Sequence, residues 1–338
     1  QGMNIPKVAG VPFSSICALR DYYGKSRMHL LNGKAMCIAV QNQKGGVSKS
    51  TTSNILGQGL ALQGHRVCII DHDPQGTQTQ NFGYFPIDFS QTDLLEEYPD
   101  LKYIGTDKRK TLSAFYDSNG AIKLKDLAIN TGWANLDVIT ANSDLFSSEL
   151  DMHHRFVDAK SRGDINRINN QYMGMLKRGV DELKKHYDVI IIDSPPSLSI
   201  FSINIFSAAD GIIMPTPPRI HDWASTQGFQ GSLCNFKGVL SDELMDFKFI
   251  KCLVTLYQPA KKRTHVKIAE EFRDAYTSKY HFKNSIKNLA EIEESYSEYL
   301  SPFEYKGVKK STRDELMKVV KELDELILDI FDIQTEGL

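Results

Sequence analysis

Short, continuous apolar runs recur along this chain, and each is followed by polar residues or by turn-forming glycine and proline. The runs cover residues 36–40, 67–70, 136–139, 189–192, 211–214 and 249–256. Because the apolar residues do not alternate with polar ones, such strands fit a sheet that helices cover on both faces. Helix-length segments separate them, at 50–63, 168–186 and 225–240. This order predicts an α/β fold with a doubly wound, mostly parallel sheet, whose ligands lie at the carboxyl ends of the strands.

Length and composition favour one main globular domain. The chain has 338 residues, 41% of them hydrophobic and 24% charged, and its formal net charge is −2. These values are typical of an ordinary folded protein, so any contact with nucleic acid must come from a local basic patch. We expect the main domain over residues 36–331. Before it, residues 1–2 resemble the remnant of a cleavable tag, and residues 3–35 form a short extension with one helix expected from Pro12 to Tyr23.

Two further segments interrupt or end the strand pattern. Residues 84–110 are polar and rich in charge, which predicts a surface insertion. A helix is expected over 311–331, with a capping box from Thr312 to Glu315 at its start and a tail at 332–338 after it. Its apolar stripe, expected to pack on the domain, comprises Leu316, Val319, Val320, Leu323, Ile327 and Ile330.

Cysteine usage and apolar patterning favour a cytoplasmic protein. No apolar stretch approaches the ~20 residues of a membrane span, and the N-terminus has no signal-peptide apolar region. The five cysteines form no Cys-x-x-Cys pair, which is typical of reduced thiols. They are Cys17, Cys37, Cys68, Cys234 and Cys252.

A glycine-containing loop separates the first predicted strand from the helix after it. Residues 44–51 read Lys-Gly-Gly-Val-Ser-Lys-Ser-Thr. Where a strand leads into a helix, backbone N–H groups and the helix dipole converge on an anion such as a phosphate. Lys49 is expected to reach the β- and γ-phosphates of a nucleotide, and the Ser50 hydroxyl to bind Mg²⁺.

The loop departs from the ordinary phosphate-loop pattern, G-x-x-x-x-G-K-[ST]. Ser48 stands where that pattern has glycine, and no glycine lies five positions earlier. Glycine accepts backbone angles that other residues avoid, so Ser48 implies a compatible angle or mild strain and leaves the catalytic rate open. A polar strand-to-helix turn with surface lysines is the alternative interpretation.

Acidic residues follow two of the other predicted strands. Asp71 and Asp73 come directly after the run at 67–70, and Asp193 follows the run at 189–192. A carboxylate at a strand end beside the phosphate loop can hold Mg²⁺ or its water shell. Aspartates that merely begin turns before proline or glycine are the alternative.

Three sequence motifs together resemble the ParA/MinD family of deviant Walker A ATPases, and the ParA partition branch in particular. They are KGGVSKST from Lys44, DHDPQGTQT from Asp71 and IIIDSPPS from Ile190. The segments 111–115, 136–145, 213–218 and 253–257 also follow in family order, so the resemblance covers roughly residues 36–330. It implies a P-loop fold, ATPase activity, and ATP or ADP with Mg²⁺ as cofactors.

The resemblance also implies a role for each matched residue. Lys44 matches the signature lysine, which reaches across an ATP-sandwich homodimer to the partner's phosphates, and Asp73 matches the residue that positions or activates the attacking water. Asp193 matches the Walker B residue, acting on Mg²⁺ through the second shell, and the three residues after it match a γ-phosphate switch. Asp71 and Ser50 complete the expected magnesium site. The residues expected to bind nucleotide are Lys44, Gly45, Gly46, Val47, Ser48, Lys49, Ser50, Thr51, Pro217 and Pro218, the two prolines at the adenine pocket.

Partition ATPases that this chain resembles bind DNA without sequence preference as ATP dimers, and a ParB-like centromere-binding adaptor stimulates their hydrolysis. Such a protein is nucleoid-associated while ATP is bound. Two basic clusters could supply the DNA contacts, although ordinary solvated charge is the alternative for both. The candidates are Lys261, Lys262 and Arg263 in one cluster and Lys306, Lys309, Lys310 and Arg313 in the other.

Three other functions share parts of this pattern. A MinD-like or other cargo-positioning ATPase of the same family would act on a membrane or on protein cargo. Membrane action needs a cationic amphipathic C-terminal helix, but the last helix here has an acidic face; protein cargo stays open. Iron–sulfur carriers with this core need clustered cysteines, which are absent, although single bridging cysteines stay possible. A scaffold that binds nucleotide without hydrolysing it stays open because of Ser48. Residues 3–35 are too few for a helix-turn-helix domain, so we expect no binding to a specific operator. The acidic face of the last helix leads us to expect no membrane binding.

Overall fold

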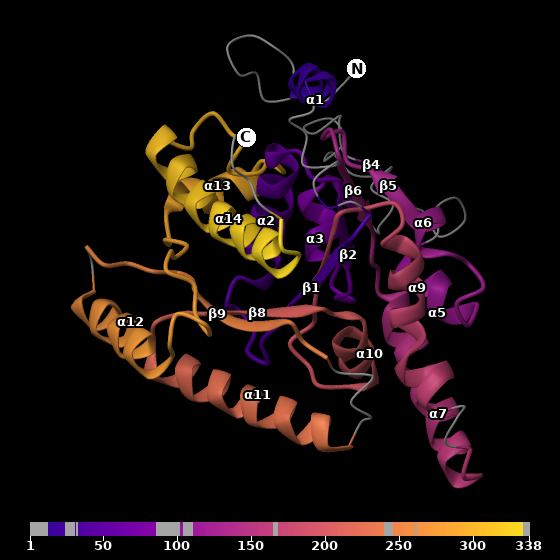
Figure 1. Cartoon of the computed structure of the whole chain (residues 1–338). Helices are drawn as coiled ribbons and strands as arrows, with labels where there is room; N and C mark the ends of the chain where they lie inside the picture. Colours follow the sequence, from indigo (N-terminus) through magenta and orange to yellow (C-terminus); the bar gives the residue numbers. More distant parts are fainter. Residues whose placement is uncertain are drawn as a thin grey trace.

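A seven-stranded sheet forms the centre of the computed structural model, which describes residues 13–23, 31, 33–85, 102–103, 111–164, 168–239, 246–260 and 262–333 (Figure 1). The strand order is β5-β6-β2-β7-β1-β8-β9, and all neighbours are parallel except β5 and β6. This confirms the predicted doubly wound, mostly parallel fold. The strands are β1 (Met36–Val40), β2 (Val67–Asp71), β5 (Ala128–Asn130), β6 (Leu136–Ile139), β7 (Val189–Asp193), β8 (Gly211–Thr216) and β9 (Phe249–Val254).

Helices cover both faces of the sheet and divide the core into two apolar clusters. Alternate residues of β1 point to the two sides: Cys37 and Ala39 lie in one cluster, Ile38 and Val40 in the other. The first side is covered by α5 (Leu112–Asp117), α7 (Asp144–Ser161), α9 (Met175–Leu183), α10 (Ile200–Ala208) and α11 (Ile220–Val239). The second is covered by α2 (Lys49–Gln63), α13 (Ala290–Ser297) and α14 (Lys310–Ile330) (Figure 1).

Helix α2 is held tightly between the sheet and α14, and this contact fixes its N-terminus beside the end of β1. A Cβ at Gly57 would collide with Ile69 of β2, and a Cβ at Gly59 would collide with Val320 of α14. The helix ends at Gly64, whose φ of 98° suits glycine. The glycines therefore serve close packing, although they weaken the helix itself.

Three element boundaries differ from those expected. Helix α11 begins at Ile220, five residues before the predicted start, and the segment predicted as one helix from 168 to 186 comprises a π-helical turn, η2 (Ile168–Met173), followed by α9. The predicted capping box is wrong, because α14 begins at Lys310 and Thr312 lies inside its first turn. The Thr312 hydroxyl donates instead to the Glu291 carboxylate of α13. The predicted apolar stripe of α14 is buried from Leu316 to Ile327.

The remaining elements lie around this domain. They are α1 (Phe13–Tyr22), α3 (Thr77–Asn81), α6 (Leu124–Leu127), α12 (Arg263–Ala275), and the two-stranded parallel pair β3 (Tyr84–Phe85) and β4 (Lys102–Tyr103). Within the predicted insertion at 84–110, the structure describes only β3 and β4, and the remaining residues up to 110 lie outside the described ranges. Of the five cysteines, Cys234 is exposed and the other four are buried. Among the helices that the structure describes, none combines the length and apolarity needed to cross a membrane.

Candidate nucleotide-binding site

The carboxyl ends of β1, β2 and β7 meet at one edge of the sheet. Asp193 pairs in register with Val40 on one side and with Asp71 on the other. The phosphate loop leaves β1 immediately after Val40, so both acidic strand ends lie beside it. The structure thus brings together the loop and the aspartates that the sequence placed far apart.

Ser48 precedes α2 in a left-handed backbone conformation, with φ 68° and ψ 39°. Its side chain makes no capping hydrogen bond, although its carbonyl accepts the Thr52 N–H at 2.9 Å. An L-residue in this conformation carries about 1–2 kcal/mol of strain that glycine avoids. The sequence allowed either an ordinary backbone angle or mild strain at Ser48, and the structure shows the strained conformation. Gly46 has a positive φ as well, 71°, so the loop turns sharply twice before the helix.

The Lys49 side chain folds back under the loop and is buried. Its ammonium group donates to the Lys44 carbonyl at 3.1 Å. Burial lowers the pKa of Lys49, and the negative charges of Asp193 and Asp73 partly oppose this shift. A buried cation that donates to a neutral backbone carbonyl is suited to an incoming anion, as a phosphate-binding lysine requires.

Asp193 is fully buried at the end of β7. One carboxylate oxygen accepts the Ser53 hydroxyl at 3.0 Å, and the other, Oδ2, has no hydrogen-bond partner among the described residues. Burial raises the pKa of Asp193, while the hydroxyls of Ser50 and Ser53 counteract the shift. An unpaired buried carboxylate oxygen beside the Ser50 hydroxyl is the oxygen donor set that Mg²⁺ prefers, so these two residues fit the ion.

Asp71 uses its carboxylate to hold its own loop. One oxygen accepts the backbone N–H and the hydroxyl of Thr79, at 2.7 and 2.6 Å, and the other accepts the Asp73 N–H at 3.2 Å. Burial and the neighbouring Asp193 raise the pKa of Asp71. These contacts favour a structural role over the magnesium role expected from the sequence. They also fix Asp73, which lies partly exposed above Lys49 and accepts the Gln75 N–H at 2.9 Å.

Lys44 is ion-paired within its own chain. Its ammonium group contacts the Asp222 carboxylate in the first turn of α11. Asn42, on the same loop, donates its amide to the Pro215 carbonyl at 2.9 Å and to the Thr226 hydroxyl at 3.0 Å. The first half of the phosphate loop is therefore tied to the end of β8 and to the start of α11.

Pro217 and Pro218, expected at the adenine pocket, are buried directly after β8. They lie between the β8 and α11 residues to which Asn42 and Lys44 connect the loop. Their role at an adenine pocket stays a prediction.

Comparison with known proteins assigns the family. The profile of a family described as an AAA domain matches residues 35–246 of this chain. Protein SopA of Escherichia coli K12 is 28% identical over 330 residues, which are 96% of this chain and 77% of SopA. The chain belongs to the ParA/MinD family of P-loop ATPases.

Further relatives agree with this assignment. The sporulation initiation inhibitor protein Soj of Bacillus subtilis is 34% identical over 180 residues, 53% of this chain and 56% of Soj. Among solved structures, apo McdA of Cyanothece aligns with a TM-score of 0.66 at 16% identity, covering 86% of this chain and 99% of McdA. At that identity the structural likeness supports the fold.

The residues expected to contact DNA in a ParA-like protein are separated by the structure into two places. Lys262 and Arg263 are exposed at the start of α12, while Lys261 lies outside the described residues. Lys306, Lys309 and Lys310 are exposed near the start of α14. Arg313 differs from them, because its guanidinium donates to the carbonyls of Pro302 at 3.1 Å and Tyr305 at 2.6 Å. These bonds favour a structural role for Arg313.

Several site residues were missed from the sequence. Asp222 stands just before the predicted start of a helix, and Ser53 lies outside the motifs quoted above. Thr79 is the last residue of the DHDPQGTQT motif, but no role was predicted for it. His72 was also missed, although it lies between the two aspartates of the second motif. Its ring nitrogen Nε2 lies 2.6 Å from the Tyr116 hydroxyl. Asp222 could have been found as a candidate because it is an acidic residue shortly after the end of a predicted strand, near the start of a helix.

Proposed function

We propose that this chain is an ATP-dependent DNA-partition ATPase. In this proposal, ATP with Mg²⁺ forms a sandwich homodimer that binds DNA without sequence preference, and a ParB-like adaptor stimulates its slow hydrolysis. The proposal is carried by three residues that meet at one sheet edge: buried Lys49, Asp193, whose Oδ2 atom has no hydrogen-bond partner among the described residues, and Asp73. Lys44 lies on the same loop as Lys49.

Each residue has a defined task in phosphoryl transfer. The amides at the N-terminus of α2 and the Lys49 ammonium bind the phosphates. Ser50 and Asp193 would hold Mg²⁺, which neutralises charge on the phosphate oxygens when bound. Asp73 is a carboxylate fixed by the Asp71 loop, so it can orient water and accept its proton.

Lys44 gives the proposal its dependence on dimerisation. A lysine supplied by a second copy adds positive charge at the γ-phosphate only in the dimer, so hydrolysis and assembly become linked. Similarity to the chromosome partitioning protein ParA of Caulobacter vibrioides, which is 32% identical over 181 residues, supports partition as the process served.

The buried stripe of α14 argues against the MinD-like alternative for this helix. Val319, Val320 and Leu323 are fully buried in the core cluster that includes α2. An apolar face that already stabilises the fold is not free to enter a lipid interface. We therefore propose no membrane partner for α14.

DNA binding by the purified chain tests the proposal. Binding to arbitrary duplex DNA is measured with ATP, ADP or no nucleotide, across a salt series, for the wild type and Lys44→Ala. We expect binding only with ATP, a steep loss with salt, and little binding by Lys44→Ala. Equal binding in all nucleotide states would refute the proposal.

A further inference from the structure

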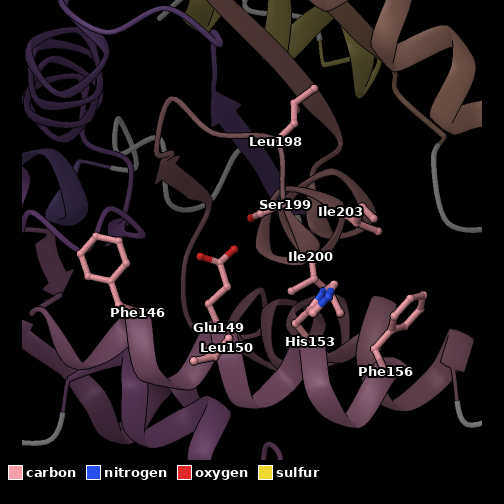
Figure 2. Close-up of a pocket in the computed structure, with 9 residues that line it drawn as sticks. All are labelled: Phe146, Glu149, Leu150, His153, Phe156, Leu198, Ser199, Ile200 and Ile203. Atoms are coloured by element: carbon pink, nitrogen blue, oxygen red, sulfur yellow. The ribbon is translucent and has the colours of Figure 1, made fainter. Parts of the chain in front are cut away.

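An apolar groove lies on the outer surface between α7 and the start of α10 (Figure 2). Its volume is about 610 Å³. Helix α7 supplies Phe146 and Leu150, which are 55% and 57% exposed, although both are large apolar side chains. The opposite wall comes from Leu198, Ile200 and Ile203. This groove takes no part in the nucleotide site described above.

The groove contains the carboxylate of Glu149, which forms no ion pair with the residues that the structure describes. Figure 2 shows Glu149 pointing from α7 into the space between the two walls. Its Oε1 atom is buried and has no hydrogen-bond partner among the described residues. Arg155, a cation on the same helix, is already paired with Asp151, at 2.5 Å between Nη2 and Oδ2. A partner that covers the groove must therefore bring a cation to Glu149, or leave a buried charge unpaired.

We propose that the groove binds an amphipathic helix of another protein, which places apolar side chains between Leu150 and Ile203 and one arginine or lysine on Glu149. Exposed apolar residues at i and i+4 on a helix, facing a second apolar wall, are the surface that such helices recognise. A second copy of this chain fits less well, because pairing two α7 helices face to face would bury a second Glu149 carboxylate rather than supply a cation.

The groove is joined to the nucleotide site by an aromatic cluster. Phe201, between the groove residues Ile200 and Ile203, stacks on Tyr116 with ring centroids 4.4 Å apart. The Tyr116 hydroxyl lies 2.6 Å from His72, the residue before Asp73. Burial, and after it the charge of Glu149, raises the pKa of Tyr116, so Glu149 acts electrostatically on this ring. A helix that neutralises Glu149 and presses on α10 therefore acts on the loop that carries Asp73; this effect on turnover rests on the proposed function.

A peptide selection tests the docking surface. A displayed library of peptides of about 18 residues, or five helical turns, is selected against the full chain with ATP and Mg²⁺. Recovered peptides are synthesised with a fluorophore, and Kd is measured by anisotropy. We expect apolar residues at helical spacing with one arginine or lysine. Removal of a charge-assisted bond with Glu149→Gln should weaken binding about tenfold or more.

Matched variants separate the groove from general effects. Leu150→Asp should abolish binding, whereas Val157→Ala, at an exposed apolar residue of α7 outside the groove, should change Kd less than twofold. Glu149→Lys should recover binding when the peptide's basic residue is exchanged for glutamate, which proves the pairing. Peptides that bind Glu149→Gln and Leu150→Asp as tightly as the wild type would overturn the proposal.

Two further readouts keep the alternatives distinct. Sedimentation with ATP shows whether Leu150→Asp prevents dimerisation; if it does, a second copy occupies the groove and the proposal is wrong. ATP turnover is measured with and without peptide. Wild-type protein without any turnover would refute the proposed ATPase function while leaving the peptide affinities standing, so the two failures are distinguishable.

Discussion

Lys44 of the phosphate loop and Asp222 of α11 form an ion pair within one chain. The Asp222 side chain is 1% exposed, while that of Lys44 is 39% exposed. A lysine that acts on a partner's phosphates must leave this contact. Arg219, whose Nη1 lies 3.8 Å from the second Asp222 oxygen, is positioned to compensate the aspartate when Lys44 departs. If the chain forms the proposed ATP dimer, we therefore expect the pair to oppose dimerisation until ATP is bound.

Removal of the Asp222 charge should ease dimerisation. In Asp222→Asn, Lys44 loses its intrachain partner, so the ATP concentration that half-saturates dimer formation should fall about two- to fivefold, the value of a partly screened ion pair. Sedimentation velocity across an ATP titration measures this. Asp274→Asn, an exposed aspartate of α12, is the control and should match the wild type. An unchanged titration for Asp222→Asn would show that the pair does not restrain Lys44.

The strained Ser48 backbone should respond to substitution in both directions. Ser48→Gly relieves the strain of the left-handed conformation but raises the conformational entropy of the unfolded chain. We therefore expect a net gain of about 0.5–1 kcal/mol in the free energy of unfolding. Ser48→Val, with a β-branched side chain at φ 68°, should lose at least about 1 kcal/mol. Urea unfolding without nucleotide measures both. A loss of stability in Ser48→Gly would mean that the serine side chain stabilises the loop.

The sheet and the core of the site could be predicted from the sequence because parallel strands determine them. Continuous apolar runs identified β1, β2 and β7, and the carboxyl ends of parallel strands share one edge, which brought Asp71 and Asp193 to the loop. The different roles of Asp71, which holds its own loop, and Asp193, which fits Mg²⁺, were less predictable. They depend on the hydrogen bonds that Thr79, at the end of the second motif, donates to Asp71, and the motif alone does not specify them.

Side-chain pairing between distant segments was not predictable. The Lys44–Asp222 contact depends on where α11 begins, and the sequence placed that start five residues too late because residues 220–224 have no clear helix signal before them. The groove beside α7 was missed for a related reason. Phe146 and Leu150 suit a core-facing helix stripe, and only the packed structure shows that a different face, with Leu145 and Met152, is buried instead.

Substitution of Asp73 by alanine should mainly lower ATP turnover, whereas substitution of Asp71 should mainly lower stability. Asp73→Ala should still bind ATP and dimerise, but turnover should fall about a hundredfold or more, the usual contribution of a general base. Phosphate release and sedimentation with ATP measure these properties. Asp71→Ala should instead lose about 2 kcal/mol of stability, because Thr79 loses its buried acceptor. Wild-type hydrolysis by Asp73→Ala would remove it from the assigned role.

His72 should make stability depend on pH. Burial lowers the pKa of this histidine from 6.5 to about 4 in the folded chain. Between these values the unfolded chain binds the proton and the folded chain does not, so the free energy of unfolding falls as pH drops. From pH 7.5 to 5, His72 should contribute a loss of about 2 kcal/mol.

Comparison with a variant isolates this contribution from other titrating groups. His72→Phe keeps an aromatic ring against Tyr116 and Phe201 but cannot bind a proton. Its stability relative to the wild type should therefore rise by about 2 kcal/mol between pH 7.5 and pH 5, measured by urea unfolding at each pH. His154→Gln, at an exposed histidine of α7, should show no such change. A constant difference between wild type and His72→Phe would mean that His72 binds its proton as readily in the folded chain as in the unfolded chain.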